Sequence, residues 1–264
     1  MDIISTDYIW NNSLPKRNNY FLLPESIRGL CIGRSGSGKS TFINNLILKP
    51  KLLDYDCLYI FGNSLHQLEY KIMRAAFDKR LSKEQMQVIF SNQKLVNKHG
   101  GPLEVIENYN MECKGDIDAY FYDSCDSIPD PSSLDESKKN LMIFDDCMTD
   151  NQSKISDFFT RGRHGNCCVF YLSQSYFHLP RHAIRENANF IILFRQSIKN
   201  LQHLYQDIVA HDGIPFSTFV QDFCNASWDE SKHSFVTIDL TRTVATGKYR
   251  KRLDWFWFPA NSVN

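Results

Sequence analysis

Nine consecutive residues near the start of the chain have the spacing of a phosphate-binding loop. The first eight match the pattern G-x-x-x-x-G-K-[ST], and the nine residues are Gly33, Arg34, Ser35, Gly36, Ser37, Gly38, Lys39, Ser40 and Thr41. Glycines let such a loop wrap until its backbone N–H groups face phosphate oxygens. In this pattern the Lys39 amine reaches the β- and γ-phosphates, and the Ser40 hydroxyl binds Mg²⁺. We therefore expect this loop to hold a nucleoside triphosphate.

Two adjacent carboxylates after an apolar run supply a second part of such a site. The apolar residues 141–144 are followed by Asp145 and Asp146, which is the Walker B form. Asp145 is expected to hold Mg²⁺, and Asp146 is expected to orient or deprotonate the attacking water. Most ATPases of this type have Glu at the second position, and paired acids after a strand can also cap a helix. The phosphate loop favours the catalytic interpretation.

Two further positions are candidates for sensing the nucleotide and for stabilising the transition state. Gln174 follows the apolar run 167–172, where an amide beside the γ-phosphate can sense it and steer water. Arg163, just after the helix expected over 151–161, is a candidate arginine finger for the nucleotide of a neighbouring subunit, with Arg161 as the second candidate. The alternatives are a turn residue at Gln174 and basic capping of a helix C-terminus.

The elements that would position these residues alternate between strands and helices. Continuous apolar runs, which are typical of strands buried on both faces, occur at 30–32, 57–61, 88–90, 141–144, 167–172 and 190–194. Helices are expected at 39–49, 65–77, 82–87, 151–161 and 197–210. This alternation predicts an α/β fold of three layers with a mainly parallel central sheet. Residues 234–240 alternate instead, which predicts an edge strand with one solvated face.

Composition divides the chain into three parts, the second of which contains an insertion. Residues 1–28 are polar and turn-rich and are expected to be extended, 29–196 form the core, and 197–264 are expected to pack on it as a C-terminal extension. Within the core, periodicity is lost between about 99 and 140. Residues 116–136 carry seven acidic side chains and no basic one, which indicates a mobile surface insertion.

The overall composition excludes several classes of protein. Charged residues make up 23% of the chain and hydrophobic residues 42%, so wholesale disorder is excluded. No apolar run is long enough for a membrane-spanning helix, and the first residues lack the pattern of a secretory signal. The eight cysteines form no C-x-x-C pair, so we expect reduced thiols that pack in the core.

Two basic segments are candidates for contact with nucleic acid, because zero net charge leaves such binding to local patches. Arg181, His182 and Arg185 follow the Gln174 strand and are candidates for neutralising phosphates. The basic run 248–252 precedes the aromatic run 255–258, a combination that can bind nucleic acid. The second segment also fits a solvated turn followed by an aromatic strand, and we favour that interpretation.

In their order and spacing these motifs resemble the virion DNA-packaging ATPases of poxviruses, with relatives in virophages and Polinton-type elements. Those proteins belong to the FtsK–HerA superfamily of P-loop DNA translocases. The resemblance covers roughly residues 29–196 and is strongest over 141–195. The segments that carry it are Leu141–Asp146, Gly162–His164 and Leu172–Tyr176.

The resemblance implies a RecA-like core whose Gln-bearing strand lies between the phosphate-loop strand and the Walker B strand. It also implies ATP and Mg²⁺ as cofactors and a homo-oligomeric ring around double-stranded DNA. The activity that it implies is ATP-driven loading of the viral genome into preformed capsids. The expected partners are then DNA, further copies of this chain and capsid or portal-vertex proteins, with no membrane. The expected location is the virion or the viral factory in the host cytoplasm.

Two other classes of function stay open at this stage. A small-molecule or nucleotide kinase also uses a phosphate loop, although kinases seldom have paired aspartates at a strand end. A nucleotide-gated capsid-assembly factor would bind ATP without acting as a motor. A GTPase is disfavoured because neither N-K-x-D nor D-x-x-G occurs, and an ABC-type ATPase because no L-S-G-G-Q-like signature occurs.

Overall fold

The computed structural model describes residues 18–19, 21–92, 96–97 and 100–259 of the chain. These residues form one sheet of nine strands in the order β3-β2-β4-β5-β1-β6-β7-β8-β9. Neighbouring strands are parallel from β3 to β6 and antiparallel from β6 to β9. In chain order the strands are β1 (Arg28–Ile32), β2 (Cys57–Gly62), β3 (Asp118–Tyr122), β4 (Asn140–Asp145), β5 (Cys167–Ser173), β6 (Phe190–Phe194), β7 (Phe235–Asp239), β8 (Tyr249–Lys251) and β9 (Trp255–Phe256).

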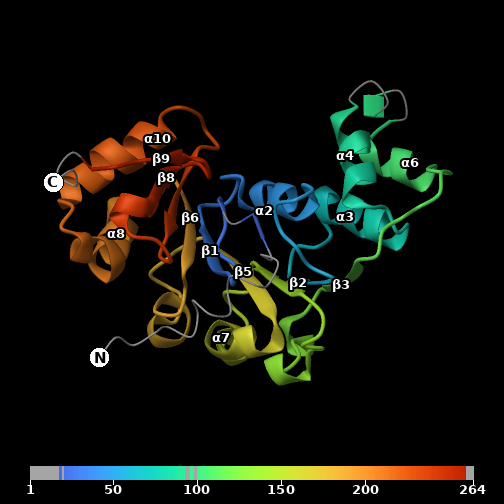
Figure 1. Ribbon diagram of the computed structural model, residues 1–264, viewed down its shortest axis with the longest axis horizontal. Helices are drawn as coiled ribbons and strands as arrows, with labels where there is room; N and C mark the ends of the chain where they lie inside the picture. Colours follow the sequence, from blue (N-terminus) through green and yellow to red (C-terminus); the bar gives the residue numbers. More distant parts are fainter. Residues whose placement is uncertain (1–17, 20, 93–95, 98–99, 260–264) are drawn as a thin grey trace, which may run out of the picture.

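Helices cover both faces of the sheet (Figure 1). One face packs against α2 (Lys39–Leu48), α3 (Leu68–Asp78), α4 (Lys83–Ser91) and α6 (Pro102–Glu107). The other face packs against α7 (Gln152–Arg161), α8 (Ile198–Leu204) and α10 (Ala226–Trp228). Shorter helical segments are η1 (Cys125–Ser127), η2 (Pro131–Ser133), η3 (Gly162–Gly165), η4 (Arg181–Arg185), η5 (Tyr205–Val209), η6 (Ala210–Asp212), α9 (Phe216–Thr218), η7 (Phe219–Asn225) and η8 (Val244–Thr246).

Successive side chains of the buried strands belong alternately to the two hydrophobic cores. In β1, Leu30 and Ile32 belong to the core under α7, whereas Cys31 belongs to the core under α2 and α3. A strand that is buried on both faces has no polar alternation, which is why its sequence is a continuous apolar run. The predicted three-layer α/β fold with a mainly parallel sheet is therefore confirmed. The predicted place of the Gln174 strand is also confirmed, because β5 lies between β4 and β1.

The predicted strand at 88–90 is wrong, because these residues belong to helix α4. Ser82 begins this helix with a capping box: its hydroxyl accepts a hydrogen bond from the Gln85 N–H, and the Gln85 side chain accepts one from the Ser82 N–H. Met86 and Ile89 are buried three residues apart, whereas Val88 is 65% exposed. Three-residue spacing is helical, so the short apolar run belongs to one face of this helix. The helix predicted at 82–87 therefore ends too early.

The interpretation of residues 99–140 as an insertion outside the sheet is wrong for β3. This strand pairs in parallel with β2, and Tyr120 and Tyr122 stack on the β2 rings Tyr59 and Phe61. After β3, Cys125, Ile128 and Leu134 are buried in the core under α7. Three of the seven acids that suggested a solvated run serve local structure here. Asp130 and Asp135 accept hydrogen bonds from backbone N–H groups two residues on, and Asp118 pairs with Arg80 and Lys138.

The predicted edge strand at 234–240 is wrong in its position, because β7 lies between β6 and β8. Residues 236–239 are all buried. Asp239 there forms an ion pair with Arg250 of β8, and both side chains are almost fully buried. The sheet therefore runs on across residue 196, the predicted boundary between the core and the C-terminal extension. The division of the chain into domains stays a prediction.

Three smaller expectations concern the ends of the chain and the cysteines. Residues 1–17 of the predicted N-terminal segment lie outside the described residues, whereas Leu23 and Ile27 are buried just before β1. All eight cysteines are free, and all but Cys113 are buried, which confirms their expected packing role. Among the described residues, no helix has the length and apolar character needed to cross a membrane.

Candidate functional site

The glycine-rich segment connects β1 to α2 at the carboxyl edge of the parallel strands. Gly33 donates its N–H to the Ser173 carbonyl of β5 at 3.0 Å. A Cβ on Gly33 would lie 2.4 Å from Ser37 Oγ and 2.9 Å from Phe194 Cβ, so a larger residue does not fit there. Gly36 and Gly38 have φ of +70° and +102°, a region that L side chains rarely adopt. The three glycines are thus required by the path of the loop.

The loop leaves donors open for an anion. Gly38 precedes α2 without a side-chain cap, so the first N–H groups of this helix are available. Lys39 folds back over the loop, where its Nζ donates to the carbonyls of Gly33 at 2.7 Å and Arg34 at 3.1 Å. Ser37 Oγ is buried and has no hydrogen-bond partner among the described residues. A polyanion seated in the loop would satisfy these groups.

Asp145 ends β4 beside the loop and receives two hydroxyl groups on one oxygen. Its Oδ2 accepts hydrogen bonds from Ser40 Oγ at 3.1 Å and from the Tyr70 hydroxyl of α3. Burial raises the pKa of Asp145, and these two hydrogen bonds and the Lys39 charge oppose that rise. Burial, together with the Asp145 charge, also raises the pKa of Tyr70, so Tyr70 remains a hydrogen-bond donor. The structure thus brings the two predicted Mg²⁺ ligands into direct contact.

Asp146 follows in the left-handed conformation, with φ of 59°. Aspartate tolerates this region better than most residues, and the turn directs its carboxylate away from the core. The residue is exposed, and its Oδ2 lies 3.5 Å from Ser64 Oγ. Its carbonyl accepts a hydrogen bond from Asn63 Nδ2 at 3.2 Å. The loop after β2 therefore supports the position of the second carboxylate.

Apart from Gly33 and Arg34, the predicted residues that act within one subunit line a single cavity of about 220 Å³. Residues 35–41 form one side of it, and Asp145, Asp146 and Gln174 form the other. Ser64, Gln67, Glu69 and Leu172 complete the lining. Parallel strands end at a common edge, which is why side chains that follow β1, β4 and β5 meet there although they are far apart in the chain.

Arg163 does not join this cavity. It lies in η3, which precedes β5, at the amino edge of the sheet. The seven residues of β5 span about 20 Å between that edge and Gln174. Arg161 is held in ion pairs with Asp130 and Asp157, whereas Arg163 is exposed and pairs with no carboxylate among the described residues.

The residues predicted to contact nucleic acid differ in their exposure. Arg185 is wrong as an exposed contact, because it is paired with Asp207 at 2.8 Å, lies over the Tyr176 ring, and its side chain is only 9% exposed. Arg181 and His182 are exposed, although both lie near Glu186.

In the second basic segment, the favoured solvated turn is also wrong for Lys248 and Arg250. Lys248 is paired with Asp212, and Arg250 is fully buried against Asp239. Trp257 packs against the core as expected, whereas Trp255 is 74% exposed.

Sequence reasoning missed three groups at the site. They are Tyr70, the Asn63–Ser64 pair and His233, whose Nδ1 lies 3.1 Å from the Ser37 carbonyl. None lies in a motif, and His233 is 196 residues from Ser37 in the chain. The tertiary fold brings them to the site: Tyr70 reaches Asp145 from α3, and His233 reaches the loop from the segment before β7.

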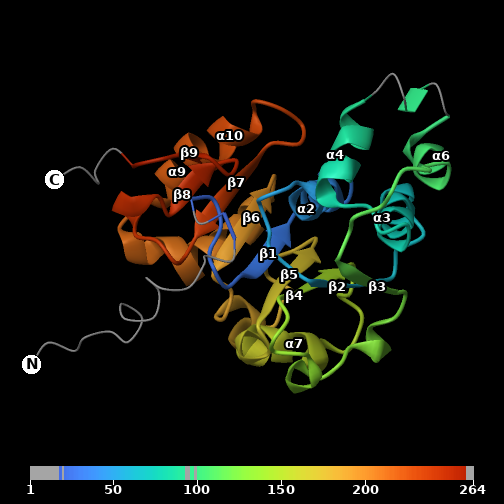
Figure 2. The same ribbon diagram turned by 45° about the vertical axis from the view of Figure 1, so that its right-hand side comes forward.

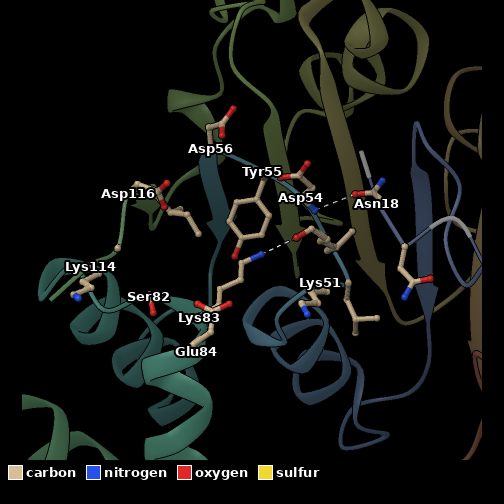
Figure 3. Close-up of a pocket in the computed structure, with 15 residues that line it drawn as sticks. Asn18, Lys51, Asp54, Tyr55, Asp56, Ser82, Lys83, Glu84, Lys114 and Asp116 are labelled. Carbon is tan, nitrogen blue, oxygen red and sulfur yellow. Dashed lines mark hydrogen bonds between the residues drawn. The ribbon is translucent and has the colours of Figure 1, made fainter. Parts of the chain in front are cut away.

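A larger cavity of about 580 Å³ lies at the opposite edge of the sheet (Figure 3). It is lined by residues that precede β2 and by the start of α4, among them Asp54, Tyr55 and Lys83. Lys83 lies over the Tyr55 ring and donates to the Leu53 carbonyl at 2.7 Å. None of the predicted site residues lines this cavity, so size alone does not identify the functional site.

A glycine loop connects a buried strand to a helix, and an aspartate from the next strand but one in the sheet contacts the serine that follows the lysine. This arrangement defines a P-loop NTPase. Within that class, the chain belongs to the poxvirus A32 protein family. The family described as Poxvirus A32 protein matches residues 16–213. The resemblance to the poxvirus type of packaging ATPase is thereby confirmed.

Solved structures with a similar fold include viral and bacterial proteins. The genome packaging NTPase B204 from Sulfolobus turreted icosahedral virus 2, in complex with AMPPCP, is 15% identical with a TM-score of 0.50, over 83% of this chain and 95% of that chain. VirB4 of Thermoanaerobacter pseudethanolicus is 11% identical with a TM-score of 0.44, over 83% of this chain and 87% of that chain. The match to B204 supports the α/β P-loop fold. No curated protein matches the chain.

Proposed function

We propose that this chain is the ATP-driven motor that moves viral double-stranded DNA into preformed capsids. Membership of the A32 family and the fold support a genome-packaging ATPase. The observation that carries the proposal is the convergence of Lys39, Ser40, Asp145, Asp146 and Gln174 around one cavity. B204, which shares the fold, is a genome packaging NTPase and was solved with AMPPCP and with ATP-gammaS, which supports ATP as the nucleotide here.

The side chains at the cavity fit Mg²⁺ and a triphosphate. Ser40 Oγ and Asp145 Oδ2 are oxygen donors of the kind that Mg²⁺ prefers, and they lie 3.1 Å apart. When bound, the ion would neutralise charge that develops on the phosphate oxygens. Lys39 would exchange the loop carbonyls for β- and γ-phosphate oxygens, and the buried Ser37 hydroxyl would gain a partner.

Asp146 and Gln174 are suited to act on water rather than on the nucleotide itself. Asp146 is exposed to the cavity and is held by the loop after β2, so its carboxylate can orient or deprotonate the attacking water. Gln174, at the end of β5, can sense the γ-phosphate and steer the same water.

Arg163 is proposed as a finger that acts on the neighbouring subunit. It lies at the edge of the sheet opposite to the cavity of its own chain, so it has no role there. A head-to-tail ring contact joins two different surfaces of the subunit, and a group remote from its own cavity can then face that of the neighbour. Arg161 is less suited because two carboxylates already hold it.

The partners and the location follow from the same proposal. We propose a homo-oligomeric ring on double-stranded DNA, contact with capsid or portal-vertex proteins, and action in the virion or the viral factory. Arg181 and His182 remain candidates for the DNA phosphates because both are exposed. Binding through phosphates should weaken steeply with salt and show little preference for sequence.

The test uses the full chain with ATP, Mg²⁺ and duplex DNA. Hydrolysis by the wild type should rise with duplex DNA, and a DNA-bound triplex strand should be displaced as the motor advances. Lys39→Ala should lose ATP binding and hydrolysis together. Asp146→Asn should keep ATP binding and lose hydrolysis by about 10²-fold or more. Negative-stain images with Mg·ATP and duplex DNA should show closed rings around the duplex.

Two outcomes would contradict the motor. An assembly factor would be favoured if ATP binds but its hydrolysis does not respond to DNA and no triplex strand is displaced. Normal packaging by Asp146→Asn would favour it too. Transfer of the γ-phosphate to a small molecule instead of water would favour a kinase.

A further inference from the structure

The cavity at the phosphate loop is too small for a whole nucleotide. Its volume is about 220 Å³, below the roughly 300 Å³ at which pockets for molecules of that size begin. Its lining contains Asp145 at the end of β4 and Gln174 just after β5, and both of these strands lie on the same side of β1. This cavity therefore suits the γ-phosphate end of the nucleotide, and the nucleoside must lie elsewhere.

The sheet order indicates where the nucleoside goes. The loop follows β1, with β5 and β4 on one side of that strand and β6 and β7 on the other. A triphosphate whose γ end lies beside Gln174 runs along the loop, so its α-phosphate leaves on the β6 side. At that end of the sheet, Phe194 of β6 is paired with Phe235 of β7, and the chain just before Phe235 reaches the loop.

His233 is the side chain that makes this contact. Its Nδ1 lies 3.1 Å from the Ser37 carbonyl, and a Cβ on Gly38 would lie 3.3 Å from the same nitrogen. Because a carbonyl only accepts, Nδ1 carries the hydrogen, which fixes one edge of the imidazole on the loop. The residue is otherwise exposed, so an aromatic face is free beside the path that we infer for the α-phosphate.

The segment 229–234 that carries His233 makes two exposed ion pairs and leads directly into Phe235, which packs beneath the loop. Asp229 is paired with Arg195, which follows β6, and Glu230 lies 3.6 Å from Arg252. Below the loop, the Phe42 ring of α2 packs edge-on against Phe235 with centroids 4.7 Å apart. Figure 2 shows α10 and β7 on the β6 side of β1. The ring is thus positioned before any ligand arrives, which lowers the entropic cost of binding.

We propose that the segment 229–234 forms the nucleoside half of the site and that the imidazole of His233 stacks on the nucleobase. The inference rests on the proposed function, because it assumes that the loop binds a nucleotide. It assigns to the C-terminal part of the chain a direct role in binding the ligand that the phosphate loop holds.

The test compares two ligands that share the phosphate tail but not the base. Calorimetry measures binding of Mg·ATP and of Mg·tripolyphosphate to the wild type, His233→Ala and His233→Phe. Removing a stacked aromatic group should weaken ATP binding by about tenfold and leave tripolyphosphate binding unchanged within about twofold. His233→Phe keeps an aromatic face and should bind ATP much as the wild type does. His211→Ala, at an exposed histidine of η6, is the matched control.

Each other outcome overturns the proposal in a recognisable way. Equal weakening of both ligands in His233→Ala would show that the histidine only holds the loop. Unchanged binding of both would show that it has no role, and loss of ATP binding in His233→Phe would exclude stacking. A wild type that binds tripolyphosphate but not ATP would overturn the nucleoside site, and one that binds neither would overturn the proposed function as well.

Discussion

At the scale of single residues, the Asp145 carboxylate shows how a buried charge is held ready for a metal ion. Burial disfavours its ionised form, and the hydroxyls of Ser40 and Tyr70 oppose that effect at the same oxygen. Ser40 is expected to turn to Mg²⁺ when the ion binds, whereas Tyr70 is fully buried in α3 and has no other role at the site. Tyr70 is therefore expected to keep Asp145 oriented in both states.

Tyr70→Phe should weaken the response to Mg²⁺ more than the affinity for the nucleotide tail. The variant removes a donor to a charged oxygen, a contact of about 1.5–3 kcal/mol. We expect the Mg²⁺ concentration for half-maximal ATP hydrolysis to rise several-fold, while tripolyphosphate binding without Mg²⁺ stays unchanged. A titration of hydrolysis rate against Mg²⁺ measures the effect.

Tyr55→Phe is the matched control for that experiment. Tyr55 is also buried, and its hydroxyl donates to the Ile47 carbonyl at 3.0 Å, away from the cavity. Both variants lose a buried hydrogen bond, so both should lower stability. An equal shift of the Mg²⁺ requirement in the two variants would mean that Tyr70 acts only through the fold.

At the scale of elements, the sequence predicts those whose local pattern and packing agree. β1, β4, β5 and β6 are continuous apolar runs because both of their faces are covered, and the loop and Walker B residues follow directly from motifs. β3 escaped prediction because its tyrosines stack on β2 while its acids suggest solvent. Arg250 escaped because its partner, Asp239, lies on another strand. Pairing across the sheet leaves no local signal.

Helix α4 carries a lysine whose burial should make the stability depend on pH. Desolvation lowers the pKa of Lys83 to about 8, and the charges of nearby carboxylates oppose that shift without cancelling it. Between pH 8 and 10.5 the unfolded chain then binds more protons than the folded chain, so the contribution of Lys83 to stability rises with pH, by at most about 1.4 kcal/mol per unit.

Urea unfolding of the wild type and Lys83→Met at pH 7.5 and 9.5 checks this expectation. The wild type should gain stability relative to Lys83→Met as the pH rises. Lys114→Met removes an exposed lysine from the same cavity, so its free energy of unfolding should change with pH as that of the wild type does. The same change with pH in Lys83→Met would refute the expectation.

At the antiparallel end of the sheet, the buried Asp239 carboxylate is paired with both Arg250 and Arg242. Arg250 and Asp239 are 0% and 1% exposed, and Arg250 also donates to the Leu22 carbonyl at 2.7 Å. Arg250→Met would leave a buried charge without this partner, so we expect a loss of about 3–5 kcal/mol in the free energy of unfolding. Arg80, whose side chain is 55% exposed, is paired with Asp118. Arg80→Met should therefore lower the free energy of unfolding by about 1 kcal/mol or less. Similar losses in the two variants would contradict the assigned role.

At the scale of the whole molecule, the sheet separates the cavity from Arg163. The cavity with Lys39 and Asp145 lies at the carboxyl edge, and Arg163 lies at the amino edge near the start of β1 and β5. Arg28, which begins β1, has a lowered pKa because of burial and of the Arg163 charge. Phosphates brought to this face by a neighbouring subunit would stabilise its positive charges. One subunit alone therefore holds an incomplete site under the proposed ring.

Mixing two inactive variants tests that arrangement. Arg163→Ala should keep ATP binding and lose about 10³-fold in turnover, and Lys39→Ala should lose binding. In mixed rings, the cavity of an Arg163→Ala subunit is complete when its neighbour is a Lys39→Ala subunit, which keeps Arg163. Random equal mixing makes about a quarter of all subunit contacts of this kind. Hydrolysis should then recover to a comparable fraction of the wild-type rate, and a double variant should restore nothing. If mixing restores no activity while rings still form, Arg163 acts within its own chain as a structural residue.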